Sequence, residues 1–229
     1  AAVERFVEAV LRGSTARRFL SQFVPFQRRL GFFGAVNSLA QVGIKVASPG
    51  VPDFYQGCEL WDLNRVDPDN RRQVDFSHRA VRLAELLPLL HNVERALGGA
   101  GEAGPAVADR LARLRAAWPD ERAKLWTTLG ALRLRRARPE LFLLGTYRPL
   151  FSADGSARLL AFAREWEGQI VVAVVPRRGA AAAWDAPVLP IGRETWGETR
   201  IAVPAALASR QVVNALTGTI VPVAREGDE

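Results

Sequence analysis

The sequence predicts an α+β protein in two parts, a mainly helical region over residues 1–140 and an antiparallel β domain over residues 141–229. Up to about Arg136, apolar side chains recur at the spacing of amphipathic helices, in stretches separated by glycine and proline. After Pro139 the apolar runs become short and rich in β-branched residues, with Gly, Pro and Asp-Gly turns between them. The period of the apolar pattern therefore changes near residue 140.

The amino-terminal region is predicted to form helices that end at a firm break. A first helical pattern stops at Gly13, and Pro25 suits the first turn of a further helix because its missing N–H would have no partner there. The stretch from Pro25 to Val46 is long and apolar, so we expect a buried helix that leads to a strand. The Ser-Pro-Gly-Val-Pro sequence of residues 48–52 ends it.

A short strand and a long polar loop are expected next. Residues 53–57 are predicted to be the end of a strand, and the loop from Glu59 to Asp75 has 17 residues, five of them acidic. A loop of this length in a compact domain is usually functional or disordered. Its Trp, Leu and Val residues and its paired Asp and Arg residues argue for an ordered, functional loop.

The remaining elements follow from the same two periodicities. Helices are predicted over residues 77–97, 105–118 and 119–136, the last two each opened by a proline. Strands are predicted over residues 159–163, 169–175, 199–203, 211–213 and 219–223.

Composition and charge argue against several function classes. The formal net charge is +7, but the arginines are spread through helical segments without a nucleic-acid-binding motif, so nucleic acid is not a predicted partner. No uninterrupted run of 18 apolar residues occurs, so no membrane partner is predicted either. Cys58 is the only cysteine, which excludes an internal disulfide and favours the cytoplasm. His78 and His91 have no companion ligands, so neither a metal nor another cofactor is expected.

Two adjacent stretches are distinctive: PGVPDFYQGCELWDL at residues 49–63 and VDPDNRRQVD at residues 66–75. The first resembles the segment around the eighth barrel strand of the α-amylase family, which has a G-x-P-x-x-Y-x-G-x-E pattern. Together they closely resemble the maltooligosyltrehalose synthase family. Shorter similarities lie at residues 25–26, 37–41, 124–126 and 139–142, so the resemblance covers roughly residues 19–150 and continues more weakly beyond.

The resemblance implies a (β/α)₈ barrel. This chain would hold its last strand with the flanking helices and a helical insert, followed by a carboxy-terminal antiparallel β-sandwich domain. The implied reaction turns the terminal α-1,4 linkage of a maltooligosaccharide into an α,α-1,1 linkage by intramolecular transglucosylation, through a covalent glycosyl intermediate in a site that excludes water. The family's catalytic Asp, Glu and second Asp lie upstream of anything present here, so no catalytic residue is assigned.

The chain is therefore expected to be the carboxy-terminal piece of a longer enzyme and to be inactive alone. It contains no methionine and begins inside a predicted helix. Its expected partners are an α-glucan and the missing amino-terminal part of the same polypeptide. Helices over residues 19–47 would lose their barrel neighbours, and each large apolar side chain left in water forfeits about 1.5–3 kcal/mol. Self-association, rearrangement or disorder of the amino end are the expected alternatives.

Five residues are candidates for substrate binding. Asp67 and Arg71 are similar to a pair that contacts a sugar unit in relatives, and a carboxylate with a guanidinium can bind a sugar diol. The alternative is an ion pair that only ties the loop. Trp61 could stack on a sugar ring or pack within the loop. Tyr55 and Glu59 would lie at the catalytic mouth of the barrel, where Glu59 could instead brace the structure.

Two other functions remain open. The chain could be a glucan-binding or structural module without chemistry. It could also belong to another α-amylase-family enzyme, a hydrolase or a glucanotransferase.

Overall fold

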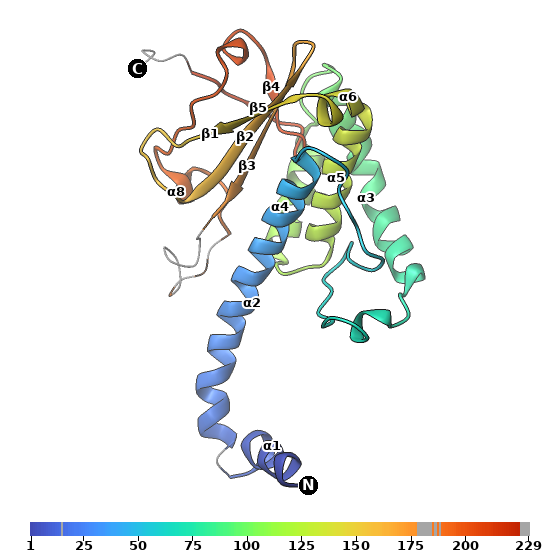
Figure 1. Cartoon of the computed structure of the whole chain (residues 1–229), viewed down its shortest axis with the longest axis vertical. Helices are drawn as coiled ribbons and strands as arrows, with labels where there is room; N and C mark the ends of the chain where they lie inside the picture. The colour runs from blue at the N-terminus through green and yellow to red at the C-terminus, as the bar shows by residue number, and fades with distance from the viewer. Residues whose placement is uncertain (15, 178–184, 186, 188, 225–229) are drawn as a thin grey trace.

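The computed structural model describes residues 1–14, 16–177, 185, 187 and 189–224. It is an α+β structure in which a long helix, α2 (Ala16–Ala47), enters a body of helices and a small sheet. Figure 1 shows α1 (Ala2–Arg12) at the far end of α2, away from that body. The carboxy-terminal part of α2 packs against α5 (Arg122–Ala137) and β3 (Gln169–Pro176).

The expectation that a new helix begins at Pro25 is wrong, because α2 is continuous and carries Pro25 in its interior. The proline removes one hydrogen bond to the carbonyl of residue 21. Residue 21 is exposed, so water can hydrate that carbonyl and the helix continues. The predicted burial holds only for the later turns of α2, from Phe33 to Ala47. Earlier apolar side chains are exposed, among them Phe19, Phe23, Phe26 and Leu30.

By length and composition alone, α2 is long and apolar enough to cross a membrane, with a hydropathy of 1.3 over an 18-residue window. The sequence criterion of an uninterrupted apolar run was therefore too strict. The core helix of a soluble protein passes the same test, and 33% of that window is buried in the body of this structure.

The carboxy-terminal end of α2 is held by two arginines from other elements. Nη1 of Arg135, on α5, donates to the carbonyls of Val46 and Ser48 at 2.6 and 3.1 Å, and Nη2 donates to that of Gly50. The last carbonyls of a helix have no partner within the helix, so donors from elsewhere satisfy them. The predicted break at residues 48–52 is confirmed, and Arg135 fixes where the chain leaves the helix.

The second arginine, Arg164 on β2 (Leu159–Trp166), is 1% exposed. Its guanidinium donates to four backbone carbonyls: those of Thr146 at 2.8 Å, Ala47 at 3.3 Å, Phe142 at 2.9 Å and Gly145 at 2.8 Å. Arg164 thereby joins the end of α2, the short helix α6 (Pro139–Leu143) and the first strand of the sheet.

The expected barrel strand over residues 53–57 is absent. From residue 48 to residue 75 the chain has only one short helical turn, η1 (Asp69–Arg71). A parallel strand needs hydrogen-bonding neighbours. No strand of the described part of the chain pairs with residues 53–57. The long loop that was expected from Glu59 to Asp75 is confirmed.

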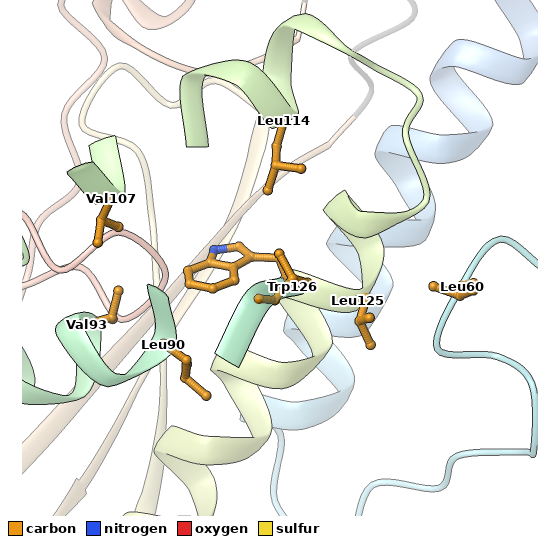
Figure 2. Close-up of a cluster of buried hydrophobic side chains, with 8 residues drawn as sticks. Leu60, Leu90, Val93, Val107, Leu114, Leu125 and Trp126 are labelled. Carbon is orange, nitrogen blue, oxygen red and sulfur yellow. The ribbon is translucent and has the colours of Figure 1, made fainter. Parts of the chain in front are cut away.

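The helices α3 (Phe76–Leu97), α4 (Pro105–Ala116) and α5 enclose the largest apolar core. In Figure 2 the Trp126 indole lies amid Leu90, Val93, Val107 and Leu114. Full burial of a leucine or valine side chain contributes about 1.5–3 kcal/mol to the stability of the fold. Leu60 belongs to the same core, so the long loop is anchored in it. The predicted helices are confirmed, except that α5 begins at Arg122 and not at Pro119.

The β part is smaller than a sandwich. A three-stranded antiparallel sheet has the order β1 (Thr146–Leu150), β2, β3, and a separate two-stranded ladder joins β4 (Val212–Val213) to β5 (Ile220–Val221). The predicted strand over residues 199–203 is reduced to a bridge between Ser152 and Ile201. The short helices α8 (Arg193–Trp196) and η2 (Ala205–Leu207) complete the described part.

Neither the barrel nor the sandwich is therefore confirmed, whereas the α+β class is. The sequence missed β1, because it is short and contains Pro149. Helix gives way to strand between α6 and β1, close to the predicted boundary at residue 140. Ala47, Leu141, Phe142 and Phe162 share one apolar cluster across this boundary. The division into two domains stays a prediction.

Replacing Arg164 by Met is expected to lower the free energy of unfolding of the chain by roughly 2–4 kcal/mol, because buried carbonyl oxygens lose their donor. Urea unfolding followed by circular dichroism measures this loss. Arg148→Met is the control, since the Arg148 side chain is 58% exposed and lies 3.8 Å from Glu165. An Arg164→Met effect as small as that of the control would contradict the role of Arg164 as the junction.

Candidate functional site

The candidate site is the segment of residues 49–75, which we call the tract. It leaves the end of α2 and runs to the start of α3, and Figure 1 shows it as an extended loop below the helical body. All five predicted site residues lie on it. Their contacts decide which of the alternative roles each one fits.

Trp61 is turned toward the turn between α4 and α5. Its Nε1–H donates to the carbonyl of Pro119 at 2.7 Å, and its ring meets that of Trp118 edge to face, with centroids 5.8 Å apart. The ammonium of Lys124 lies 5.7 Å from the Trp61 ring centroid. These contacts favour packing over sugar stacking as the role of Trp61.

Glu59 is engaged by a single arginine at the start of α3. Nε of Arg79 donates to Glu59 Oε2 at 3.2 Å, and the same guanidinium donates to the carbonyls of Gly57 at 2.7 Å and Asp75 at 3.1 Å. Arg79 therefore joins Gly57 and Glu59, in the middle of the tract, to its last residue, Asp75. The geometry fits the bracing role for Glu59. Tyr55, by contrast, is 50% exposed, so its ring is available to a ligand.

Asp67 and Arg71 form the predicted pair. Arg71 Nε and Nη2 donate to the two carboxylate oxygens of Asp67 at 2.7 and 2.6 Å, and both side chains stay more than half exposed. Asp69 accepts from the backbone N–H of Arg65 at 2.8 Å and from the Arg72 side chain. The Asp67–Arg71 pair thus organises the loop around η1 while remaining accessible, which keeps both predicted roles open.

Behind the tract lie groups that the sequence reasoning did not single out as site residues. Lys124 is only 9% exposed, and burial lowers the pKa of its ammonium. Lys45 lies over the Phe54 ring, 3.8 Å from its centroid. Burial raises the pKa of Cys58, which favours the protonated thiol and fits an inert packing role. The resemblance had included Lys124 in a matching stretch, which was the one signal for it.

An ionic network ties the α4–α5 turn to α3. Glu121 accepts from Arg82 Nε at 3.0 Å and lies 2.5 Å from His78 Nε2. Arg122 Nε and Nη2 donate to the carboxylate of Asp120 at distances from 2.5 to 3.1 Å. Its Nη1 donates to Glu85 Oε2 at 3.0 Å. Hydrogen bonds from Arg122 lower the pKa of both Asp120 and Glu85. These carboxylates are structural anions that hold the turn in place.

Two hollows of the described structure lie away from the tract. One of about 230 Å³ lies between α3 and α5, near Leu90, Glu94 and Arg133, and a smaller one lies beside Trp196. No tract residue lines either of them. Within the described ranges, no cluster of three or more His, Cys, Asp or Glu side chains could hold a metal ion. The tract is thus largely exposed: it presents the Asp67–Arg71 pair to solvent together with the apolar side chains of Leu63 and Val66.

Comparison with known proteins points to one kind of enzyme. The chain is 32% identical over 198 residues to a Mycobacterium tuberculosis protein provisionally named maltooligosyl trehalose synthase. It also resembles the structure of maltooligosyltrehalose synthase from Arthrobacter ramosus, with 30% identity, 95% of this chain covered and a TM-score of 0.56. A second maltooligosyl trehalose synthase structure covers 75% of the chain at 28% identity, with a TM-score of 0.51.

The match is extensive for this chain but partial for its relatives. It covers 85% of the chain and 20% of the Mycobacterium protein, and 23% of the Arthrobacter structure. The chain thus spans about a fifth of the length of the proteins it resembles. No family model matches it.

The ion pair between Asp120 and Arg122 predicts a pH-dependent stability. Because the folded-state pKa of Asp120 is below its ordinary value, its contribution is fully present above the unfolded-state pKa of about 4 and is lost as the pH falls through the lower folded-state value. The destabilisation caused by Asp120→Asn should therefore be largest near neutral pH and shrink below about pH 4. Urea unfolding of both proteins at a series of pH values measures it, and a difference that stays constant with pH would contradict the assignment.

Proposed function

We infer that this chain is part of a maltooligosyltrehalose synthase, as its sequence analysis predicted, and that it is the carboxy-terminal portion. The whole protein would convert the terminal α-1,4 linkage of a maltooligosaccharide into an α,α-1,1 linkage by intramolecular transglucosylation. The observation that carries the inference is the similarity of 30–32% over nearly the whole chain to proteins of that name. Location in the cytoplasm stays a prediction.

The chain would supply part of the sugar site without the reacting acids. A glycosidic acid catalyst at neutral pH needs a carboxyl group with a raised pKa. Hydrogen bonds lower the pKa of every described carboxyl group that is displaced from its ordinary value, namely Asp69, Glu85, Asp120 and Asp154. These four groups therefore do not suit the role of the proton donor. The proposal assigns the proton donor and the nucleophile to the remainder of the enzyme.

The tract would form one wall of the sugar cleft. Its exposed Asp67–Arg71 pair can accept and donate hydrogen bonds to adjacent hydroxyls, and the half-exposed Tyr55 adds an aromatic edge. Intramolecular transfer must retain the released glucose and exclude water. An open loop cannot do this alone, so the opposite walls would come from the preceding part of the polypeptide.

The purified chain is expected to form no trehalosyl product from maltopentaose, because the proposal places the acid and the nucleophile in the remainder of the enzyme. The measurement is loss of reducing ends together with chromatography of the products. Formation of a non-reducing oligosaccharide by this chain would contradict the proposal that the reacting acids lie in the remainder of the enzyme. In the whole protein, release of glucose or of rearranged α-1,4 glucans instead would identify a hydrolase or a glucanotransferase.

In the whole enzyme, Asp67→Asn is expected to raise the KM for maltopentaose about tenfold, since a hydrogen bond to a charged group contributes about 1.5–3 kcal/mol and is partly screened here. The control is Asp109→Asn. Asp109 pairs with Arg113 on α4 at the same i, i+4 spacing and with similar exposure. Arg113 Nε and Nη2 both donate to Asp109 Oδ2, at 3.1 and 2.6 Å. Equal KM values for the two variants would show that the Asp67 pair only ties the loop.

A further inference from the structure

The α4–α5 turn, residues 117–121, makes the contacts that hold Trp61. We call these contacts the Trp61 seat: the carbonyl of Pro119, the ring of Trp118 and the ammonium of Lys124, which lies just after the turn. A hydrogen bond, an edge-to-face ring contact and a cation near the ring act on one indole from neighbouring positions. Trp61 is therefore placed by the turn.

The turn is itself held from two further directions. On the side of α2, the ring of Phe32 meets that of Trp118 at 5.8 Å and 69°. On the side of α3, Arg82 binds Glu121, and Glu85 is bound through Arg122. The turn that carries the Trp61 seat is thus held by contacts with α2 and α3.

Beyond Trp61 the tract has little polar attachment to the body. Within the described structure, the hydrogen bonds of residues 62–73 all join two residues of that same segment, such as Asn64 to Asp62 and Arg65 to Asp69. The next polar anchor is Asp75, whose side chain caps α3 by accepting from the His78 N–H at 2.8 Å. The exposed Asp67–Arg71 pair lies in the segment between the two anchored residues, Trp61 and Asp75.

We propose that the α4–α5 turn is a positioning element that, through the Trp61 seat, sets where the Asp67–Arg71 pair stands and thereby determines the affinity for the glucan without touching it. The proposal rests on the proposed function, since it concerns the same sugar site. It gives Trp61 the role of an anchor in place of a stacking platform. It also gives α4 and α5 a part in substrate binding.

Trp118→Phe in the whole enzyme is the direct test. The Trp118 Nε1–H has no hydrogen-bond partner within the described residues, so the change removes only part of the ring that supports Trp61. The KM for maltopentaose should rise by roughly three- to tenfold with kcat unchanged, because the pair is displaced while the reacting groups are untouched. Trp61→Phe should raise KM similarly. The double variant should be no worse than the more severe single one, since both act through one contact.

The chain offers a matched control in Trp196. Its Nε1–H donates to the carbonyl of Pro190 at 3.0 Å and Arg158 lies 5.4 Å from its ring centroid. These contacts repeat two of the three contacts of Trp61, the hydrogen bond to a proline carbonyl and the cation near the ring, at a site away from the tract. Trp196→Phe should lower the melting temperature and leave KM unchanged. Equal KM changes in Trp196→Phe and Trp118→Phe, or additive effects in the Trp61/Trp118 double variant, would overturn the proposal.

Two further outcomes separate the possible failures. If Trp118→Phe does not fold, Glu121→Gln decides, because it weakens the part-buried contacts to Arg82 and His78 and should also raise KM. An unchanged KM in Glu121→Gln would then overturn the proposal. If the wild-type enzyme forms no trehalosyl product, the proposed function fails. If it forms that product and KM is unchanged in Trp118→Phe, only the positioning role fails.

Discussion

The structure depends on two arginines that donate hydrogen bonds to the backbone carbonyls at the carboxy-terminal end of α2. Arg135 and Arg164 come from a helix and a strand, and they donate to carbonyls of the last helical residues and of the chain that follows. Burial lowers the pKa of both side chains, yet a guanidinium stays charged in proteins. Backbone carbonyls act as their partners. The helical body, the sheet and the first residues of the tract are therefore joined at one point.

Beyond that point, contacts with the helices determine the path of the tract. Leu60 enters the core of α3, α4 and α5, Glu59 is bound by Arg79, and Trp61 rests on the α4–α5 turn. Residues 53–57 have no strand beside them in the described part of the chain and stay irregular. A stretch expected to be a barrel strand is thus held by side-chain contacts at its carboxy-terminal side.

The candidate site was only partly predictable. The Asp67–Arg71 pair could be seen in the sequence, because its D-x-x-x-R spacing is similar to a sugar-contacting pair of relatives. The partners of Glu59 and Trp61 could not, since they lie on other elements: Arg79 is 20 residues away and Pro119 is 58 residues away. Lys124 offered no local pattern, and its burial beside the tract follows from the packing of α5.

The sequence by itself determined the elements with a strong local pattern: the helices α3 and α4, the break after α2, the β2–β3 hairpin and the family resemblance carried by residues 49–75. Only the tertiary structure decided that α2 runs through Pro25, that residues 53–57 are not a strand, and that Trp61 contacts the α4–α5 turn. Periodicity records which face of an element is apolar. Periodicity does not show which residues distant in the sequence will contact that element. Strand pairing and buried hydrogen bonds depend on those residues.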